Sequence, residues 1–192
     1  NGTMRFFVRT RGLAAHSGRA WRGENAIHAL APALAALASY EPKTIAVEGL
    51  DYREGLNAVQ ISGGVAGNVI PDVAAMHVNY RFAPDKTLDE AIAHVREVFA
   101  GYELDFVDLS PAARPGLDTP LAASLIEVGQ KPQPKYGWTD VARLSEIGIP
   151  AVNFGPGDAL LAHTDNEHVS FSQLTRCHAD LRAWLLSDRD ED

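Results

Sequence analysis

The sequence is poor in cysteine, in clustered positive charge and in long apolar runs. Cys177 is the single cysteine, so an internal disulfide is excluded and a reducing, cytoplasmic location is expected. No apolar run approaches the length of a membrane span, and we expect neither a membrane partner nor a signal peptide. The net charge of −8, without a dominant basic cluster, argues against a nucleic-acid partner.

The composition is that of a folded protein, since 46% of the 192 residues are hydrophobic. This length suits one large domain or two small ones. The sequence begins with Asn1-Gly2-Thr3 and runs at once into a strand-like pattern. We therefore expect either that Met4 is the natural start or that the chain is cut from a longer protein.

The first half of the chain predicts a β-α-β-β-α-β order. Segments that alternate in hydrophobicity like half-buried strands are 4–11, 56–62, 76–82 and 102–106. One helix is predicted over 24–40, kinked at Pro32, and a second over 88–99, opened by a capping box of Thr87 and Glu90. This order indicates a ferredoxin-like, four-stranded antiparallel sheet with both helices on one face. The other face, rich in Arg and His, is expected to be free for solvent or a partner.

The second half contains too few elements for an independent α/β domain. Residues 111–116 have the composition of a linker. Helices are predicted from Thr119-Pro120 to Gly129, over Val141–Ile147, and from a capping box of Ser170 and Gln173 onward. The last helix is expected to bury Leu174, Cys177, Leu181 and Leu185. The apolar run Ile149–Phe154 predicts a buried strand of a sheet whose other strands are missing.

A polar loop follows that predicted strand. Gly155-Pro156-Gly157 ends the strand, and His163 then lies in a loop at its carboxyl end, a common place for sites in α/β folds. A neutral imidazole there is a good zinc ligand. Spacing alone favours the alternative of an incidental His on a surface loop. Asp165, Glu167 and His168 are expected to fix the loop.

Three groups of motifs carry a resemblance to a known family. The first is 15–19 with 23–28, the second 52–57 with 63–72 and 81–85, and the third 135–140 with 155–157 and 162–163. Together they resemble the M20 metallopeptidase/deacylase family, and within it the actinobacterial type of succinyl-diaminopimelate desuccinylase. The first group is general to the family, whereas the other two are specific to that type.

The resemblance implies two parts. Residues 3–109 correspond to a dimerisation domain that makes a homodimer, and residues 110–192 to the carboxyl-terminal portion of a zinc-peptidase-like α/β catalytic domain. The family holds two zinc ions per subunit, with cobalt as a possible substitute. His163 matches the final His ligand of that site. Nothing else in the sequence matches the other ligands or the Glu base, so this chain alone is expected to be inactive.

The resemblance also implies roles for individual residues. His16 matches an oxyanion donor that is delivered from the partner subunit, although alone it would be taken for a loop residue. Asn68 would offer an amide to the substrate and Arg81 would hold a carboxylate; their alternatives are a turn residue and a solvated strand charge. Thr139 and Asp140 could cap a helix whose amides face an anionic substrate. Further substrate contacts are expected at Trp138, Gly157 and Asp158.

The implied reaction is metal-dependent hydrolysis of N-succinyl-LL-2,6-diaminopimelate to succinate and LL-2,6-diaminopimelate, in lysine and cell-wall precursor synthesis. The substrate is thus a small dicarboxylate amide. The alternatives are another M20 deacylase, such as an acetylornithine deacetylase or a carboxypeptidase, and a dimerisation module without catalysis.

Overall fold

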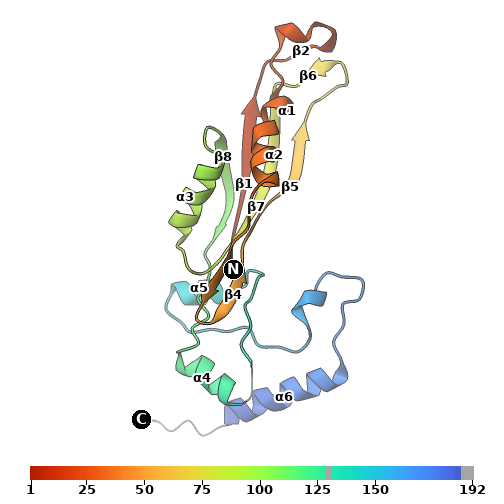
Figure 1. The fold of residues 1–192 in the computed structure, drawn as a ribbon. Helices are drawn as coiled ribbons and strands as arrows, with labels where there is room; N and C mark the ends of the chain where they lie inside the picture. The colour runs from red at the N-terminus through yellow and green to blue at the C-terminus, as the bar shows by residue number, and fades with distance from the viewer. Residues whose placement is uncertain (129–130, 187–192) are drawn as a thin grey trace.

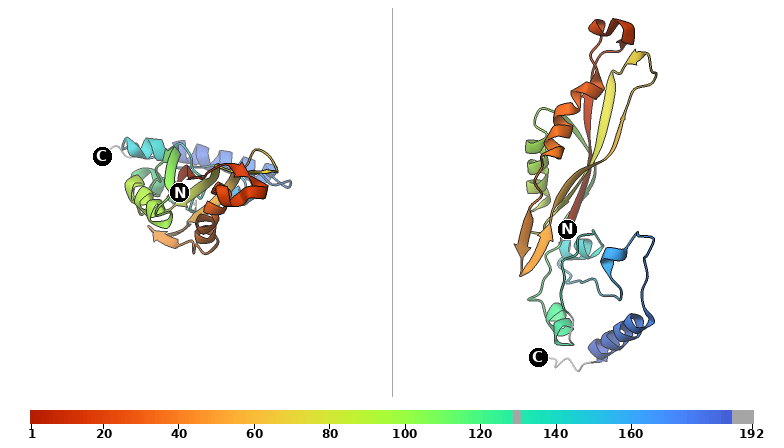
Figure 2. Two further views of the ribbon diagram at one scale, coloured as in Figure 1. Left: turned by 90° about the horizontal axis from the view of Figure 1, so that it is seen from above. Right: turned by 45° about the vertical axis from the view of Figure 1, so that its right-hand side comes forward.

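The computed structural model describes residues 1–128 and 131–186. The molecule is elongated, with a β-sheet domain at one end and a looser group of helices and loops at the other (Figure 1). The same separation is visible after rotation in the right-hand view of Figure 2. In these two ranges, no helix combines the length and apolarity that a bilayer crossing requires.

The sheet domain is built on four antiparallel strands in the order β5-β7-β1-β8. Their bounds are β1 (Gly2–Arg11), β5 (Gly55–Gly63), β7 (Val73–Phe82) and β8 (Glu103–Ser110). The first and third strands of the predicted order, β1 and β7, lie side by side at the centre. This is the ferredoxin-like topology that the alternating segments predicted, and the prediction is confirmed.

Helices cover one face of this sheet: α1 (Ala26–Ala29), α2 (Ala31–Ala38) and α3 (Leu88–Val98) (Figures 1 and 2). Alternate side chains of the two central strands point into that layer, because successive strand residues face opposite sides. The largest fully buried ones are Met4, Phe6, Val8, Met76, Val78, Tyr80 and Phe82, with Leu30, Val95 and Phe99 from the helical layer. Phe6 meets Phe99 edge-on, with ring centroids 5.6 Å apart.

The helix ends follow the sequence closely, with one difference. The Thr87–Glu90 capping box is present: the Thr87 N–H donates to Glu90 Oε2 (2.7 Å) and the Glu90 N–H to Thr87 Oγ1 (3.2 Å). The predicted kinked helix over 24–40 is instead two short helices that meet at Leu30. Pro32 sits in the first turn of α2, where its missing N–H costs no helical bond. A break rather than a kink is therefore the lower-energy outcome.

A hairpin absent from the sequence-based description lies at the lower end of the sheet. It consists of β3 (Thr44–Val47) and β4 (Leu50–Arg53), joined by Glu48 and Gly49. Both turn residues have positive φ, 50° and 79°, as a tight two-residue hairpin turn requires. Glycine adopts this conformation freely, whereas Glu48 is held in a less populated region.

The far end of the sheet domain forms a second, two-stranded sheet. It pairs β2 (Ala15–His16) with β6 (Val69–Ile70), and the 3-10 turn η1 (Ser17–Arg22) follows β2 (Figure 1). We call residues 12–23 and 64–71 together the tip. It stands beyond the end of the central strands, on the side opposite the carboxyl-terminal half (Figures 1 and 2).

The sheet face without helices is polar, and many of its charges are paired across strands. Arg5 meets Asp108 at 2.7 Å and Arg9 meets Asp105 at 2.6 Å. The Phe7 ring stacks on His77 with centroids 4.5 Å apart. The predicted open face of Arg and His side chains therefore exists, but cross-strand partners already satisfy several of them.

The carboxyl-terminal half contains short elements joined by long loops. They are α4 (Pro120–Glu127), α5 (Val141–Glu146), the 3-10 turn η2 (Ala159–Leu161) and α6 (Phe171–Leu186). Thr119 caps α4 through its hydroxyl. Gly148, at φ 75°, follows α5 where the stop was predicted. The predicted end of α4 at Gly129 lies outside the described residues.

Two predictions for this half are wrong in the described chain. Ile149–Phe154 forms no strand, because no described segment pairs with it as a neighbouring strand. The α6 capping box is present, with Ser170 and Gln173 exchanging bonds of 3.1 and 3.2 Å. Its apolar stripe, however, is not buried: Leu174 is 43% and Leu185 is 62% exposed, although the Trp184 indole N–H of the same helix donates to Ser124 Oγ of α4 at 2.7 Å.

Candidate active site

His16 ends β2 and presents one ring nitrogen outward. Its Nδ1 accepts a hydrogen bond from the Gly18 main-chain N–H at 3.0 Å. A nitrogen that accepts carries no proton, so the neutral ring holds its proton on Nε2. The residue is exposed. The tip therefore displays a fixed N–H donor, the kind of group that stabilises a developing oxyanion.

Asn68 lies beside His16, although the two residues belong to separate motifs. The Ser17 N–H donates to the Asn68 carbonyl oxygen at 2.9 Å, and His16 pairs with Val69 across the two strands. The Asn68 side chain is exposed. Two predicted site residues are thus brought together at the tip, a juxtaposition that the sequence pattern did not reveal.

Arg81 lies near the other end of β7, on the polar sheet face opposite Thr3. Its Nη1 is buried and has no hydrogen-bond partner among the described residues. Burial, and then the nearby Arg5 charge, hold the pKa of Arg81 below its usual value, with Asp108 partly offsetting them. A buried guanidinium nitrogen without a partner is costly. The site is therefore suited to a carboxylate ligand.

Thr139 and Trp138 precede α5 and connect three segments. Thr139 Oγ1 accepts from the Asn153 side-chain amide at 3.0 Å, which ties α5 to the apolar run before the Gly-Pro-Gly turn. The Trp138 indole N–H donates to the Pro111 carbonyl at 3.2 Å. Asp140 makes no side-chain cap bond to α5, so the predicted capping by its carboxylate is wrong. Its αR backbone does not place the carboxylate over the helix start.

A wide, open cavity of about 1270 Å³ lies between the base of the sheet domain, where Asn1, Leu50 and Tyr52 line it, and the carboxyl-terminal half. Thr139, Gly157, Asp158 and His168 are among the residues that line it, whereas Trp138 and His163 are not. Gly157 has φ 93°, a conformation that only glycine adopts easily. The Asp158 carboxylate accepts from the Leu160 N–H at 2.9 Å and caps η2. These two residues therefore shape the wall from which the His163 loop continues.

His163 is an exposed non-glycine residue with φ 65°. Its main-chain N–H donates to Glu167 Oε2 at 2.9 Å. His168 Nδ1 lies 2.6 Å from the Asn166 carbonyl oxygen. Glu167 and His168 thus bond to the loop's main chain, and Glu167 contacts the His163 amide rather than its ring. A left-handed residue held by such a bond indicates a functional constraint on the loop.

The described residues do not form a metal site on their own. Within residues 1–128 and 131–186, no group of three or more His, Cys, Asp or Glu side chains is placed to hold a metal ion. The exposed His163 imidazole offers a single ligand at most, and its role as a metal ligand stays a prediction. A complete site requires donors outside the described chain.

The predicted site residues therefore fall into two separate groups. His16 and Asn68 lie at the tip, and Arg81, Trp138, Thr139, Gly157, Asp158 and His163 lie at the base of the sheet domain or in the carboxyl-terminal half. The strands between them have ten residues, which corresponds to roughly 30 Å. The two groups cannot meet around one small molecule within one chain.

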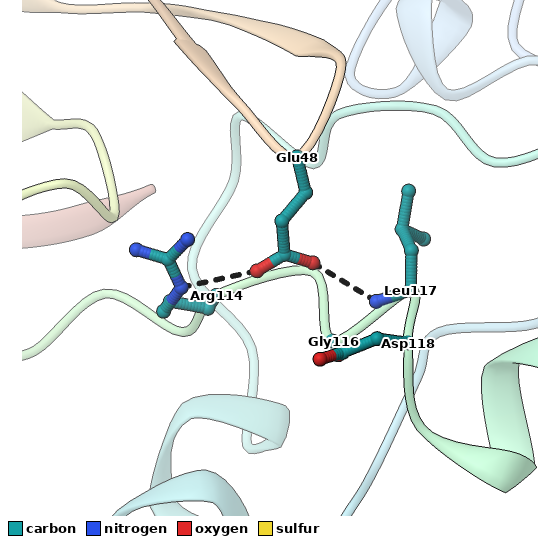
Figure 3. A pocket seen from close by; sticks show the side chains of 5 residues that line it. All are labelled: Glu48, Arg114, Gly116, Leu117 and Asp118. Atoms are coloured by element: carbon teal, nitrogen blue, oxygen red, sulfur yellow. Dashed lines mark hydrogen bonds and ion pairs between the residues drawn. The ribbon is translucent and has the colours of Figure 1, made fainter.

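A contact that sequence reasoning missed joins the sheet domain to the segment after it. Glu48, from the β3–β4 turn, accepts from Arg114 Nε at 3.0 Å and from the Leu117 N–H at 2.9 Å (Figure 3). Gly116 and Asp118 line the same small pocket (Figure 3). The positive φ of Glu48 aims its side chain at this linker. The Val47-Glu48-Gly49 turn pattern was the available signal.

Comparison with known proteins gives consistent relatives. A Mycobacterium tuberculosis protein named "Putative succinyl-diaminopimelate desuccinylase DapE" is 47% identical over 187 residues, covering 96% of this chain and 53% of that protein. A succinyl-diaminopimelate desuccinylase of Corynebacterium glutamicum is 44% identical over 191 residues, with 96% and 52% covered. The chain therefore spans about half the length of the curated relatives it matches.

Solved structures share the fold. Aminopeptidase PepT from Bacillus cereus superposes with a TM-score of 0.68 at 20% identity, covering 95% of this chain and 51% of that chain. The Bacillus subtilis protein YXEP, described as a dinuclear metal binding peptidase from the M20 family, gives 0.63 at 16% identity, with 95% and 49% covered. The family described as "Peptidase dimerisation domain" matches residues 1–105, more than half of the chain. The chain therefore belongs to the M20 peptidase family, whose dimerisation domain it carries.

Proposed function

We propose that this chain acts within a polypeptide of its relatives' length as a metal-dependent succinyl-diaminopimelate desuccinylase. The observation that carries the proposal is the identity of 47% and 44% to two relatives of that name, which runs across 96% of the chain. It includes both the dimerisation domain and the loops of the carboxyl-terminal half. The reaction adds water to the N-succinyl amide, breaks its C–N bond, and releases succinate and the free amine of LL-diaminopimelate.

The tip residues suit the transition state of amide hydrolysis. As water adds to the amide carbonyl, negative charge develops on its oxygen. The outward Nε2–H of His16 is a donor for that oxygen, because Nδ1 is engaged by Gly18. Asn68, beside it, offers a second amide to the substrate. Two zinc ions, with cobalt as a possible substitute, supply a Lewis acid and an activated water when bound at such a site, with His163 as one ligand.

Arg81 suits the charge of the substrate. N-succinyl-diaminopimelate carries several carboxylates, and each needs a donor once water is excluded. The unpartnered, buried Nη1 of Arg81 is such a donor. Thr139, Gly157 and Asp158 line the nearby cavity and, with Trp138, are proposed to position the remaining groups.

The separation of the two groups supports a homodimer built on residues 3–109. In a two-fold dimer each tip can serve the site of the other subunit, and both sites are completed at once. Residues 110–192 then form the carboxyl-terminal portion of the catalytic domain. The free thiol of Cys177 agrees with a cytoplasmic location, which we include in the proposal.

The test is product analysis with the polypeptide of full length, loaded with zinc. Succinate release from N-succinyl-LL-diaminopimelate is expected to exceed acetate release from N-acetylornithine and amino-acid release from a dipeptide by orders of magnitude. A preference for either competing substrate would show that the chain belongs to another M20 deacylase or carboxypeptidase. The 192-residue chain by itself, with zinc added, is expected to give no turnover.

A further inference from the structure

The β3–β4 hairpin reaches from the base of the sheet domain toward the carboxyl-terminal half. Figures 1 and 2 show it at the lower end of the central strands, with its turn pointing away from the tip. An isolated two-stranded hairpin is only marginally stable in water. What this hairpin does therefore depends on the contacts that hold each of its ends.

One end of the hairpin is anchored to the end of β7. Val47 and Tyr52 are buried together with Ala83, which lies two residues beyond Arg81. Glu54 follows the hairpin, and its side chain is only 2% exposed. Its carboxylate accepts from the Ala83 main-chain N–H at 2.9 Å, a bond that would be costly to break at a buried position. The hairpin is therefore fixed to the strand end that carries Arg81.

The other end of the hairpin is bonded to the carboxyl-terminal half at two places. Glu48, in the turn, accepts from Arg114 Nε and from the Leu117 N–H. Along β4, the Asp51 carbonyl oxygen accepts from the Tyr136 hydroxyl at 3.2 Å. The hairpin thus holds both the linker and the segment that leads to α5.

The hairpin also forms one wall of the cavity of about 1270 Å³. Leu50 and Tyr52 line the cavity from the hairpin, whereas Thr139 and Asp158 line it from the carboxyl-terminal half. A substrate held by Arg81 and by the second wall contacts both parts of the chain. The angle between the two parts therefore decides whether all of these contacts can form at once. Two domains in one chain move relative to each other unless contacts hold them.

We infer that the β3–β4 hairpin is a brace that fixes the orientation of the carboxyl-terminal half relative to Arg81, with Glu48 and Tyr136 as its positioning residues. The inference rests on the proposed function, because it concerns how the two parts of that site are aligned. Neither residue touches the substrate. Loss of their bonds leaves both walls intact and removes only the alignment, and a misplacement of about 1 Å can lower a rate by a factor of about 10².

The first test is kinetic and uses the full-length polypeptide loaded with zinc. Glu48→Ala combined with Tyr136→Phe, here called the released variant, should lower kcat/KM for N-succinyl-LL-diaminopimelate by roughly tenfold or more. Glu48→Gln should retain most of the activity, because its amide oxygen can still accept from the Leu117 N–H.

The control for a general loss of stability is Val95→Ala. It removes buried methyl groups from the separate core under α3, and kcat/KM should not change. Full activity in the released variant, or an equal loss of activity in Val95→Ala, would overturn the inference.

The second test shows whether the brace acts through Arg81. In an Arg81→Ala background no guanidinium remains to be aligned. The two changes of the released variant should then lower kcat/KM by less than about twofold, because changes that act on one contact are not additive. A loss that is as large in this background as in the unsubstituted polypeptide would overturn the inference.

The third test measures orientation without turnover. Nitroxide labels are placed at Ala93→Cys in α3 and Arg182→Cys in α6, both exposed positions, in a cysteine-free full-length polypeptide. Labelled subunits are diluted into unlabelled ones, so that the distance measured by electron resonance lies within one chain. Its distribution should be narrow in the otherwise unsubstituted polypeptide and in Val95→Ala, and broader in the released variant. Equal widths in all three would overturn the inference.

The brace and the proposed function can fail separately. If the distance distribution broadens in the released variant but the unsubstituted polypeptide releases no succinate, the brace is right and the assigned substrate is wrong. If the unsubstituted polypeptide releases succinate and the released variant matches it in both rate and distance distribution, the brace is wrong and the proposed function stands.

Discussion

His16 and His163 of one chain lie at opposite ends of the folded molecule. His16 ends β2 at the tip, whereas His163 lies in the loop after η2 in the carboxyl-terminal half (Figure 1). The central strands that separate them fix this distance, because they are the most buried part of the molecule. One catalytic site that uses both residues must therefore take them from two chains.

In mixed dimers, Asn68→Ala is expected to give the same pattern of activity as His16→Ala, because the β2–β6 pairing carries both residues to the same site. In the full-length polypeptide, mixed dimers of Asn68→Ala and His163→Ala should regain activity. Mixed dimers of Asn68→Ala and His16→Ala should not, since each of their sites receives one defective tip. Activity in the second pair, measured as succinate release, would contradict the structure's placement of Asn68.

Arg81 is expected to belong to the opposite group, with His163. Mixed dimers of Arg81→Ala and His16→Ala should contain one complete site, whereas those of Arg81→Ala and His163→Ala should contain none. By itself, Arg81→Ala should raise KM by roughly tenfold or more, since a charge-assisted bond is worth about 1.5–3 kcal/mol. Arg5→Ala, on the same sheet face but paired with Asp108, is the control and should change KM little.

Glu48 is expected to stabilise the junction between the sheet domain and the linker more than its ion pair suggests. Glu48→Ala removes the acceptor of the Leu117 N–H as well as the Arg114 contact and should lower the free energy of unfolding by about 1–3 kcal/mol. Arg114→Ala removes only the exposed pair and should cost less than about 1 kcal/mol. Urea denaturation of this chain checks both values, and equal losses would contradict the role of the Leu117 bond.

His94 is expected to make the sheet domain less stable in mild acid. Burial lowers the pKa of His94 below the ordinary value of 6.5. Its Nε2 lies 2.9 Å from the Tyr40 hydroxyl, and a neutral imidazole can accept a hydrogen bond from that hydroxyl. The unfolded chain then binds more protons than the folded chain just below pH 6.5. Stability is therefore present above that pH and is lost as the pH falls toward the folded-state pKa.

The measurement compares the free energy of unfolding at pH 7.5 and pH 5.5 for the unsubstituted chain and for His94→Gln. The substituted chain should lose less stability on acidification. His28→Gln, at an exposed position of α1, is the control and should retain the full loss. An unchanged loss in His94→Gln would show that other groups cause it.

The sheet domain was readable from the sequence because its signals are local. Alternation with period two marked all four strands, and the Thr87–Glu90 box marked the start of α3. The pairing of β2 with β6 was not readable, since two-residue strands carry no periodicity and their partners are far apart in the chain. The β3–β4 hairpin was missed although Glu48-Gly49 is a turn sequence.

The carboxyl-terminal half was predicted less well for a physical reason. The apolarity of Ile149–Phe154 and of the α6 stripe records burial, but burial needs a covering partner that the described residues do not supply. The site residues were identified by resemblance and not by periodicity. The orphaned Nη1 of Arg81 and the outward Nε2–H of His16 became visible only with the structure.

The most direct test of sharing between subunits uses two defined mixed dimers of the full-length polypeptide, each isolated through two different affinity tags. In the first, one subunit carries His16→Ala and the other His163→Ala. In the second, one subunit is unsubstituted and the other carries both changes. With the two-fold pairing, the first dimer has one complete site and should show about half of the unsubstituted activity.

The second dimer should fall to roughly a hundredth or less, because its only site with intact metal ligands receives a tip without the oxyanion donor. If His16 acted within its own chain, the second dimer would be half active and the first inactive. The succinate release rates of these two mixed dimers therefore test the account directly. The predicted result is a high rate for the first dimer and a low rate for the second, and the reverse would contradict it.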